Sequence, residues 1–231
     1  MTEMKVPLRA ILFDLDGTLI DTIDLILHSY RYTVAAHRFE PLPDAEWLKN
    51  IGIPLRMQFR HFTEDPDEIQ AMIKTYVDHN LEHHDDLVRE YPGVLEAVRA
   101  IASAGCKLGL VTSKMHGSLE RGLTIGGFDG LFEVVIGADD VEHPKPHPEP
   151  VLKALEALEV SSTEAVFVGD SPFDMACGRA AGVATAAALW GPFSRADLET
   201  HEPTYWLETP QALSVFVNRA AGSRSEGLEI D

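Results

Sequence analysis

Short apolar runs alternate with stretches of helical periodicity along most of the chain. The run from Ala10 to Phe13 is uninterrupted and is typical of a buried strand. Similar runs predict further strands at Lys107–Val111, Val134–Ile136, Ala165–Val168, Val183–Ala187 and Thr204–Leu207. The segments between them carry apolar residues at three- and four-residue steps, as amphipathic helices do. Strands that alternate with helices predict an α/β fold with a parallel, doubly wound sheet.

One long segment, residues 20–88, shows helical periodicity and no strand. From Ile23 to Val34 its apolar residues fall on one helical face, and the pattern returns later in the segment. We therefore predict a core domain made of residues 1–19 and 89–231, with residues 20–88 inserted as an all-helical domain.

Composition and charge narrow the function classes. The chain has 231 residues, 45% hydrophobic and 24% charged, which suits a globular protein with a sizeable core. Its formal net charge of -18 repels nucleic acid and anionic membranes, so we expect neither as a partner. Cys106 and Cys177 form no paired motif, and no apolar run reaches the roughly 18 residues of a membrane span. The N-terminus lacks an apolar leader, so we expect a cytoplasmic protein.

Two aspartates, Asp14 and Asp16, directly follow the first predicted strand. In extended backbone, residues i and i+2 point to the same side, so the two carboxylates should crowd one small volume. Such a pair is costly unless a cation or a proton lies between the charges. Gly17 permits a turn there, and Thr18 adds a hydroxyl. The pattern favours a metal-dependent active site over a polar turn, for which one capping aspartate would suffice.

Polar residues also follow later strands, where each has an ordinary structural interpretation as well. Thr112 and Ser113 offer hydroxyl and backbone N–H groups that can hold a phosphate oxygen, or they form a simple turn. Lys145 stands between two prolines that restrict its backbone, although loop lysines are usually solvated. Asp170 closes a strand, and Asp174 falls in the first turn of the next helix, which it would also suit as a capping residue. Sites in parallel sheets lie at the carboxyl ends of the strands, which favours one shared site.

Taken in order, these residues resemble the four motifs of the haloacid dehalogenase (HAD) superfamily of phosphotransferases. The motifs are D-L-D-G-T from Asp14, the lone Thr112, K-P at Lys145, and G-D-S-P-F-D ending at Asp174. The resemblance implies a Rossmann-like HAD core, with residues 20–88 as a C1-type helical cap.

Two further runs narrow the resemblance. Residues Glu82–Val88 and Val141–Pro150 are similar to the bacterial HAD-type inorganic pyrophosphatases, which are close relatives of the phosphoglycolate phosphatases. This similarity implies a small phosphorylated substrate, either inorganic pyrophosphate or a phosphoglycolate-like compound.

The HAD resemblance also implies roles for the motif residues. Asp14 would be the nucleophile that forms an aspartyl phosphate, and Asp16 would protonate the leaving group and then activate water. Thr112, Ser113 and Lys145 would bind the transferring phosphoryl oxygens.

The implied cofactor is Mg²⁺, which prefers oxygen ligands. It would be held by Asp14, the backbone carbonyl of Asp16 and Asp170, with Asp174 as a supporting ligand.

Asp16 separates the chain from several relatives with the same fold. Haloacid dehalogenases lack this aspartate, transport ATPases carry threonine there, and phosphonatases replace it and use a cap lysine, for which Lys49 or Lys74 would be available. Phosphomutases with a C1-type cap share all four motifs and stay open as an alternative. A catalytically silent binding or regulatory protein with this fold is the other alternative.

The cap offers its own candidates. Arg56 and Arg60 are four residues apart and would share a helical face, where they could bind an anionic substrate or lie in solvent. His79, His83 and His84 could likewise face the site or solvent. A metal role for these histidines is not favoured, because no carboxylate–histidine pattern fixes them.

Overall fold

The computed structural model describes residues 8–225, and its centre is a six-stranded parallel sheet. Strand β1 (Ala10–Phe13) lies between β4 (Lys107–Val111) and β6 (Ala165–Gly169). The order across the sheet is β5-β4-β1-β6-β7-β8, completed by β5 (Val134–Ile136), β7 (Ala184–Ala188) and β8 (Tyr205–Leu207). The predicted α/β fold with a parallel sheet is confirmed. Because the order reverses direction on either side of β1, the carboxyl end of β1 is where a site is expected.

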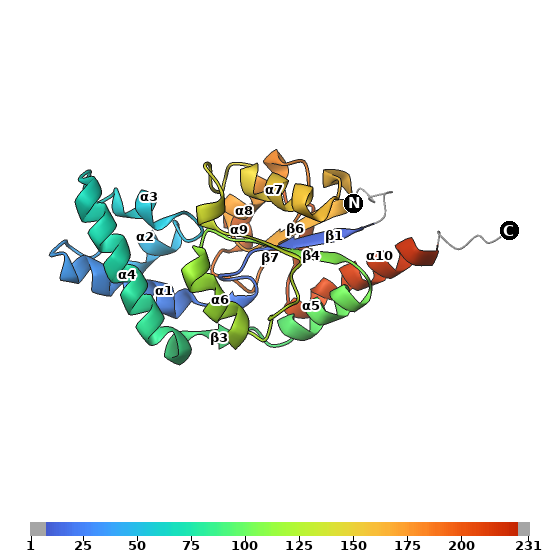
Figure 1. Ribbon diagram of the computed structural model, residues 1–231, viewed down its shortest axis with the longest axis horizontal. Coiled ribbons are helices and arrows are strands. Elements are labelled where there is room, and N and C mark those ends of the chain that lie inside the picture. The colour runs from blue at the N-terminus through green and yellow to red at the C-terminus, as the bar shows by residue number, and fades with distance from the viewer. Residues whose placement is uncertain (1–7, 226–231) are drawn as a thin grey trace.

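Helices cover both faces of this sheet (Figure 1). They are α5 (Val94–Ser103), α6 (His116–Ile125), α7 (Glu149–Leu158), α8 (Pro172–Ala180), α9 (Arg195–Glu199) and α10 (Ser214–Ser225), with 3₁₀ turns at Ala138–Asp140, Ser162–Glu164 and Pro210–Leu213. The run after Ala220, Gly-Ser-Arg-Ser-Glu-Gly, is by its composition typical of a frayed tail, but α10 continues to Ser225. Phe216 and Ala220 are both buried in the core, which anchors the helix. The rest of the expected tail lies outside the described residues.

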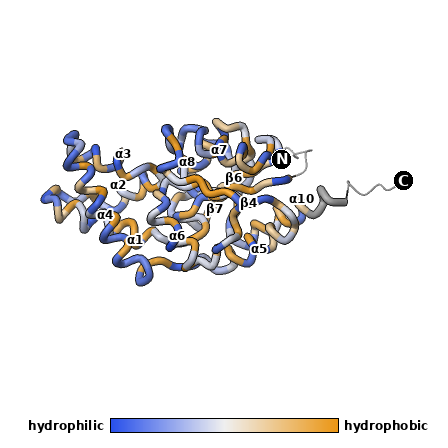
Figure 2. Tube along the Cα trace, in the orientation of Figure 1, coloured by the Kyte–Doolittle hydropathy of each residue, from blue (hydrophilic) through white to orange (hydrophobic). Residues whose placement is uncertain are grey.

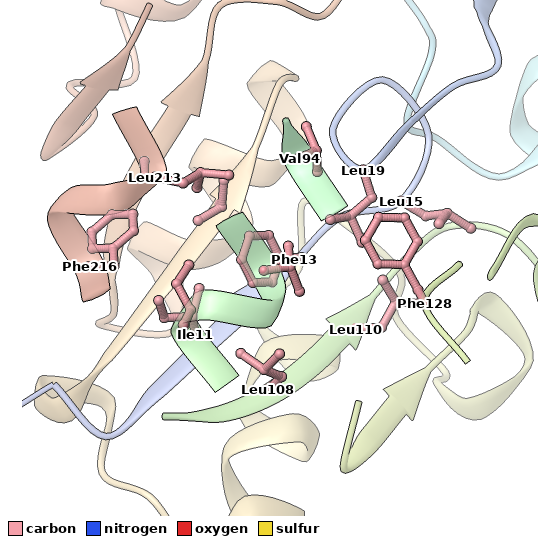
Figure 3. Packing of buried hydrophobic residues seen from close by; sticks show 14 of the residues in the cluster. Ile11, Phe13, Leu15, Leu19, Val94, Leu108, Leu110, Phe128, Leu213 and Phe216 are labelled. Carbon is pink, nitrogen blue, oxygen red and sulfur yellow. The ribbon is translucent and has the colours of Figure 1, made fainter. Parts of the chain in front are cut away.

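The two faces of β1 bury side chains into separate clusters. Ile11 and Phe13 belong to one cluster, together with residues of α5 and α10, and Figure 3 shows Phe13 at its centre. Ala10 and Leu12 belong to the other cluster, with residues of α7 and α8. This alternation follows from the two-residue period of a strand. The central strands are accordingly hydrophobic in Figure 2. Strand β1 is therefore packed against apolar side chains on both of its faces.

The segment between β1 and β4 is helical and lies to one side of the sheet (Figure 1). It contains α1 (Ile23–Ala36), α2 (Asp44–Leu48), α3 (Leu55–Phe59) and α4 (Pro66–Leu87). Aromatic stacking fills its interior, where the Tyr30 and Trp47 rings lie 4.4 Å apart and nearly parallel. We call these four helices and their connections the cap.

A two-stranded antiparallel ribbon joins the chain segments that enter and leave the cap. Strand β2 (Ile20–Asp21) pairs with β3 (Arg89–Glu90). The expectation of no strand in residues 20–88 is therefore wrong at its first two positions. A two-residue strand has no detectable periodicity, and its partner comes from the far end of the insert. Among residues 8–225, no helix is long and apolar enough to cross a membrane.

Candidate active site

Asp14 and Asp16 both lie at the carboxyl end of β1, but their carboxylates have separate partners, and Asp14 is grouped with Asp170 and Asp174. The Asp14 N–H donates to the Val168 carbonyl oxygen (2.9 Å), so this residue continues the line of the sheet. Gly17 then turns the chain with φ of 85°, in the left-handed region that favours glycine. Asp14 is 4% exposed, so its carboxylate is almost fully withdrawn from bulk water.

Lys145 is the counterion of the buried carboxylates. Its Nζ donates to Asp14 Oδ1 (2.8 Å), to Asp174 Oδ1 (2.6 Å) and to the Val111 carbonyl oxygen (3.3 Å). The side chain is 1% exposed, so the interpretation as a solvated loop lysine does not hold. Burial alone would lower the pKa of Lys145, but Asp14 and Asp174 outweigh it and raise that pKa, so the ammonium stays charged.

Asp174 has two structural roles at once. Its Oδ2 accepts from the Ser171 N–H (3.0 Å) and hydroxyl (2.6 Å), and its N–H donates to Ser171 Oγ, which forms a capping box at the start of α8. Its Oδ1 accepts from Lys145. The capping interpretation of Asp174 is therefore confirmed, its other oxygen contacts Lys145, and each of its oxygens already has a protein donor.

Asp170 differs, because only one of its oxygens has a protein partner. Its Oδ1 accepts from the Thr18 hydroxyl (2.7 Å), while Oδ2 is buried without one. A Cβ at Gly17 would lie 2.7 Å from this Oδ2, so a side chain there would fill the space beside it. Oxygens of Asp14, Asp170 and Asp174 lie within 4.8 Å of one another. An orphaned carboxylate oxygen in such a set fits a hard divalent cation.

The pKa shifts of these carboxylates also favour a bound cation. Burial raises the pKa of Asp14 to about 7; Lys145 works against this shift, and Asp174 and Asp16 add to it. Burial, followed by the charges of Asp174 and Asp14, raises the pKa of Asp170 well above its usual range. One lysine thus does not balance the buried negative charge, and a bound cation would favour the ionised forms.

Asp16 lies in a different environment from Asp14. Its Oδ1 accepts from the Thr22 hydroxyl (2.8 Å) and from Lys114 Nζ (2.8 Å). Burial opposes ionisation, but the Lys114 ammonium and these hydrogen bonds together lower the pKa of Asp16. Sequence reasoning did not select Lys114. The available signal was its position next to Thr112 and Ser113 at the end of β4.

Thr112 and Ser113 lie across from Asp14 on the neighbouring strand end. Thr112 is buried, and its Oγ1 accepts from the Lys114 N–H (3.2 Å). The Ser113 hydroxyl donates to the carbonyl oxygen of Gly52 (2.5 Å), which belongs to the cap. Ser113 therefore connects the strand end to the cap.

These groups open onto a cavity of about 440 Å³ between the sheet and the cap. Its floor includes Asp14, Asp16 and the turn from Thr112 to Lys114. Its cap wall is largely apolar or neutral and includes Ile26, Tyr30, Ile51, Leu55, Gln58, Gln70, Ile73, Tyr76 and Asn80. A cavity enclosed on two sides suits a small ligand rather than a polymer.

The predicted cap residues are not all at this cavity. Arg56 lines it and donates to Gln70 Oε1 (3.2 Å), whereas Arg60 lines a separate hollow beside Trp47. Arg60 is the C-cap of α3, one turn beyond Arg56, and at that distance its side chain lines the other hollow instead of the cavity. Of the described residues that line the cavity, none is His79, His83 or His84.

The cap lysines that a phosphonatase would need lie elsewhere. Lys49 is paired with Glu46 (2.7 Å) and Lys74 with Asp78 (2.5 Å), and both lysine side chains are mostly exposed. Neither is among the described residues that line the cavity, which agrees with the argument from Asp16.

Comparison with known proteins identifies the family. A family model described as haloacid dehalogenase-like hydrolase matches residues 11–188. The chain belongs to the haloacid dehalogenase-like hydrolases. The range matched contains every motif residue and the whole cap, so the expected HAD membership is confirmed.

Individual relatives within this HAD family are named as phosphatases and, in one case, as a phosphomutase. The chain is 42% identical over 201 residues to pyrophosphatase PpaX of Anoxybacillus flavithermus, covering 87% of this chain and 93% of the relative. A Lactobacillus plantarum structure with a provisional assignment as phosphoglycolate phosphatase has a TM-score of 0.81 at 26% identity, covering 91% and 100%. A Bacteroides vulgatus structure with a provisional assignment as β-phosphoglucomutase has a TM-score of 0.79 at 25% identity, covering 92% and 91%. The protein is thus a HAD-family phosphatase, similar to pyrophosphatases and phosphoglycolate phosphatases.

Proposed function

We propose that this HAD phosphatase hydrolyses inorganic pyrophosphate with Mg²⁺, through an aspartyl phosphate on Asp14. The observation that carries the proposal is Asp14 at the floor of the cavity, held by the buried Lys145, with the unpartnered Oδ2 of Asp170 in the same carboxylate cluster. Mg²⁺ would be held by Asp14, Asp170 and the backbone carbonyl of Asp16, and would offset the negative charge of carboxylates and substrate. Asp174 would support this set from its place beside Lys145.

The chain's own groups suit two successive displacements at phosphorus. A carboxylate oxygen of Asp14 attacks, the P–O bond to the leaving phosphate breaks, and the phosphoryl group is transferred to Asp14. Lys145 keeps Asp14 ionised and oriented, since its Nζ lies 2.8 Å from Oδ1. Asp16 then takes a proton from water, and the resulting attack releases phosphate and restores Asp14. Thr112, Ser113 and the Lys145 ammonium bind the phosphoryl oxygens as charge develops.

The setting of Asp16 supports pyrophosphate over a sugar phosphate. The contact with Lys114 lowers the pKa of Asp16, so the carboxylate form predominates and can accept a proton, while little of the protonated form is present to donate one. A phosphate leaving group needs less protonation than an alkoxide does. Arg56 adds a positive charge at the cap side of the cavity, where the second phosphate of pyrophosphate would lie.

The relevant experiment compares kcat/KM for pyrophosphate, phosphoglycolate and a sugar phosphate, with product analysis. We expect pyrophosphate to lead the sugar phosphate by at least about tenfold, which is about 1.4 kcal/mol of transition-state preference. A leading sugar phosphate would contradict the substrate assignment. Formation of an isomeric sugar phosphate instead of free phosphate would establish the phosphomutase alternative. No turnover of any of the three, with Mg²⁺ bound, would favour a catalytically silent protein.

A further inference from the structure

Three histidines meet on the outer side of the cap, away from the cavity. His28 comes from α1, and His79 and His83 are one turn apart on α4. Helices α1 and α4 pack side by side, as Figure 1 also shows. The ring centroids of His28 lie 4.9 Å from His79 and 5.2 Å from His83, and the His79 and His83 rings stack at 4.2 Å. One ring nitrogen from each residue lies within 4.8 Å of the other two.

Hydrogen bonding leaves nitrogen lone pairs available in this cluster. His83 Nδ1 lies 3.1 Å from the His79 carbonyl oxygen. Because a carbonyl can only accept, His83 Nδ1 carries the proton, and in the neutral ring Nε2 carries the lone pair. A backbone carbonyl that fixes the tautomer in this way is the usual second partner of a metal-binding histidine.

His79 supplies an independent sign of a missing ligand. The residue is 6% exposed, and its Nδ1 is buried without a hydrogen-bond partner. An unsatisfied buried nitrogen is costly, and nothing else in residues 8–225 bonds to it. Burial, together with His83 and His28, lowers the pKa of His79, which favours the neutral ring that a metal needs.

We propose that His28, His79 and His83 form a second cation site, specific for an imidazole-binding divalent transition metal such as Zn²⁺. Three imidazole nitrogens with the remaining positions left to water form a recognised zinc set. Imidazole suits Zn²⁺, Ni²⁺ and Cu²⁺, whereas Mg²⁺ takes oxygen ligands, so the two sites of this protein differ in chemistry. The proposal does not depend on the substrate of the active site.

The position of the cluster gives the bound ion a structural role. It would connect α1 to α4, and the same two helices supply Tyr30, Tyr76 and Asn80 to the wall of the cavity. The ion would therefore fix the two long cap helices against each other from outside, without entering the cavity.

The test is a calorimetric titration of Zn²⁺ into the full chain with Mg²⁺ present in excess, so that the carboxylate site is already filled. We expect about one equivalent bound with a Kd on the order of micromolar or tighter. His28→Gln and His83→Gln should each weaken binding at least about tenfold; neither side chain is fully buried, so both variants should fold. His79→Gln, checked for folding by circular dichroism, should do the same.

A second histidine cluster provides the matched control. His143, His147 and Glu149 also place ligand atoms within 4.8 Å of one another, in the loop near Lys145. The double variant His143→Gln, His147→Gln should keep the tight site. Loss of binding in that control, with affinity unchanged in His28→Gln and His83→Gln, would overturn the proposal. So would wild-type binding no tighter than about millimolar. As a second readout, Zn²⁺ should raise the Tm of the wild type and leave that of His83→Gln unchanged.

Discussion

Lys114 Nζ lies 2.8 Å from Asp16 Oδ1, and this contact joins the end of β4 to the loop after β1. Both side chains are largely buried, at 12% and 17% exposed, and the Thr22 hydroxyl is the other donor to the same oxygen. Without Lys114, the Asp16 carboxylate would be left with one hydroxyl donor in a partly desolvated place. Asp16 should then lose both its orientation and its lowered pKa.

Lys114→Met should therefore reduce kcat by roughly 10- to 100-fold, as expected when a charge-assisted hydrogen bond of about 1.5–3 kcal/mol is removed. KM should change less, and Lys114→Arg should recover part of kcat. Lys107→Met is the matched control, since Lys107 lies at the opposite end of β4 and donates to the Leu158 carbonyl oxygen. Steady-state kinetics on the three variants make the comparison. If Lys107→Met and Lys114→Met lose kcat equally, the loss comes from a disturbed fold and not from the Lys114–Asp16 contact.

The part of the active site that could be predicted from the sequence is the part set by residues at the ends of strands. Strand ends in a parallel sheet bring Asp14, Thr112 and Asp170 to one edge, so residue type and order were enough. The Lys114–Asp16 contact spans 98 positions, and no local rule selects that partner.

Partners from other helices were equally invisible in the sequence. His28 shares no periodic pattern with His79 and His83, and only the packing of α1 on α4 brings it to them. Arg60 was assigned to the cavity through a four-residue spacing, but that rule gives only a shared helical face and does not fix how far along the helix the cavity extends. Here Arg60 is the C-cap of the short helix α3, and its side chain lines the separate hollow.

Asp14→Asn should abolish turnover while the fold is retained, because a neutral amide does not attack phosphorus. Losing a nucleophile normally costs several orders of magnitude in kcat. Without metal, the variant should unfold at the same or a higher temperature than the wild type, since burial disfavours the ionised Asp14 carboxylate. Single-turnover assays and thermal unfolding provide the two readouts. Retention of more than about 1% of wild-type kcat would exclude Asp14 as the nucleophile.

Mg²⁺ should be required for activity and should raise the Tm of the wild type, because it would bind the folded protein and offset the repulsion among buried carboxylates. Asp170→Asn should lose both effects, since its Oδ2 is the unpartnered oxygen. Ca²⁺ should inhibit, because its larger and looser shell permits two-oxygen binding by Asp14. Full activity after exhaustive chelation would contradict the assignment of Mg²⁺ as the cofactor. If Mg²⁺ still raises the Tm of Asp170→Asn, the ion binds to other ligands than those proposed.

Stability should depend on pH through His116 and Asp140, whose Nε2 and Oδ2 lie 2.6 Å apart. The hydrogen bond that His116 donates to Asp140 raises the pKa of His116 above 6.5. A raised folded-state pKa gives stability that is complete below the unfolded value and is lost as pH rises through the folded value. His116→Gln should therefore lower Tm in mildly acidic buffer and have little effect in alkaline buffer. The change should be small, since half-exposed pairs contribute at most about 1 kcal/mol. A parallel scan of His61→Gln, an exposed cap histidine, is the control, and an equal pH-dependent loss there would contradict the assignment.

Arg56→Ala should raise KM for pyrophosphate by about tenfold, since a charged hydrogen bond contributes roughly 1.5–3 kcal/mol and the exposed setting of Arg56 reduces that value. The chain at net charge -18 opposes a highly charged anion, so a cation at the cavity wall matters more than it would in a neutral protein. Arg60→Ala is the matched control, because it removes the same charge from the same part of the cap but from a separate hollow. We expect its KM within about twofold of the wild type. If both variants raise KM equally, and the effect disappears at high salt, Arg56 acts only through the overall field. If neither does, the second phosphate lies away from Arg56, and the cap wall selects the substrate by shape.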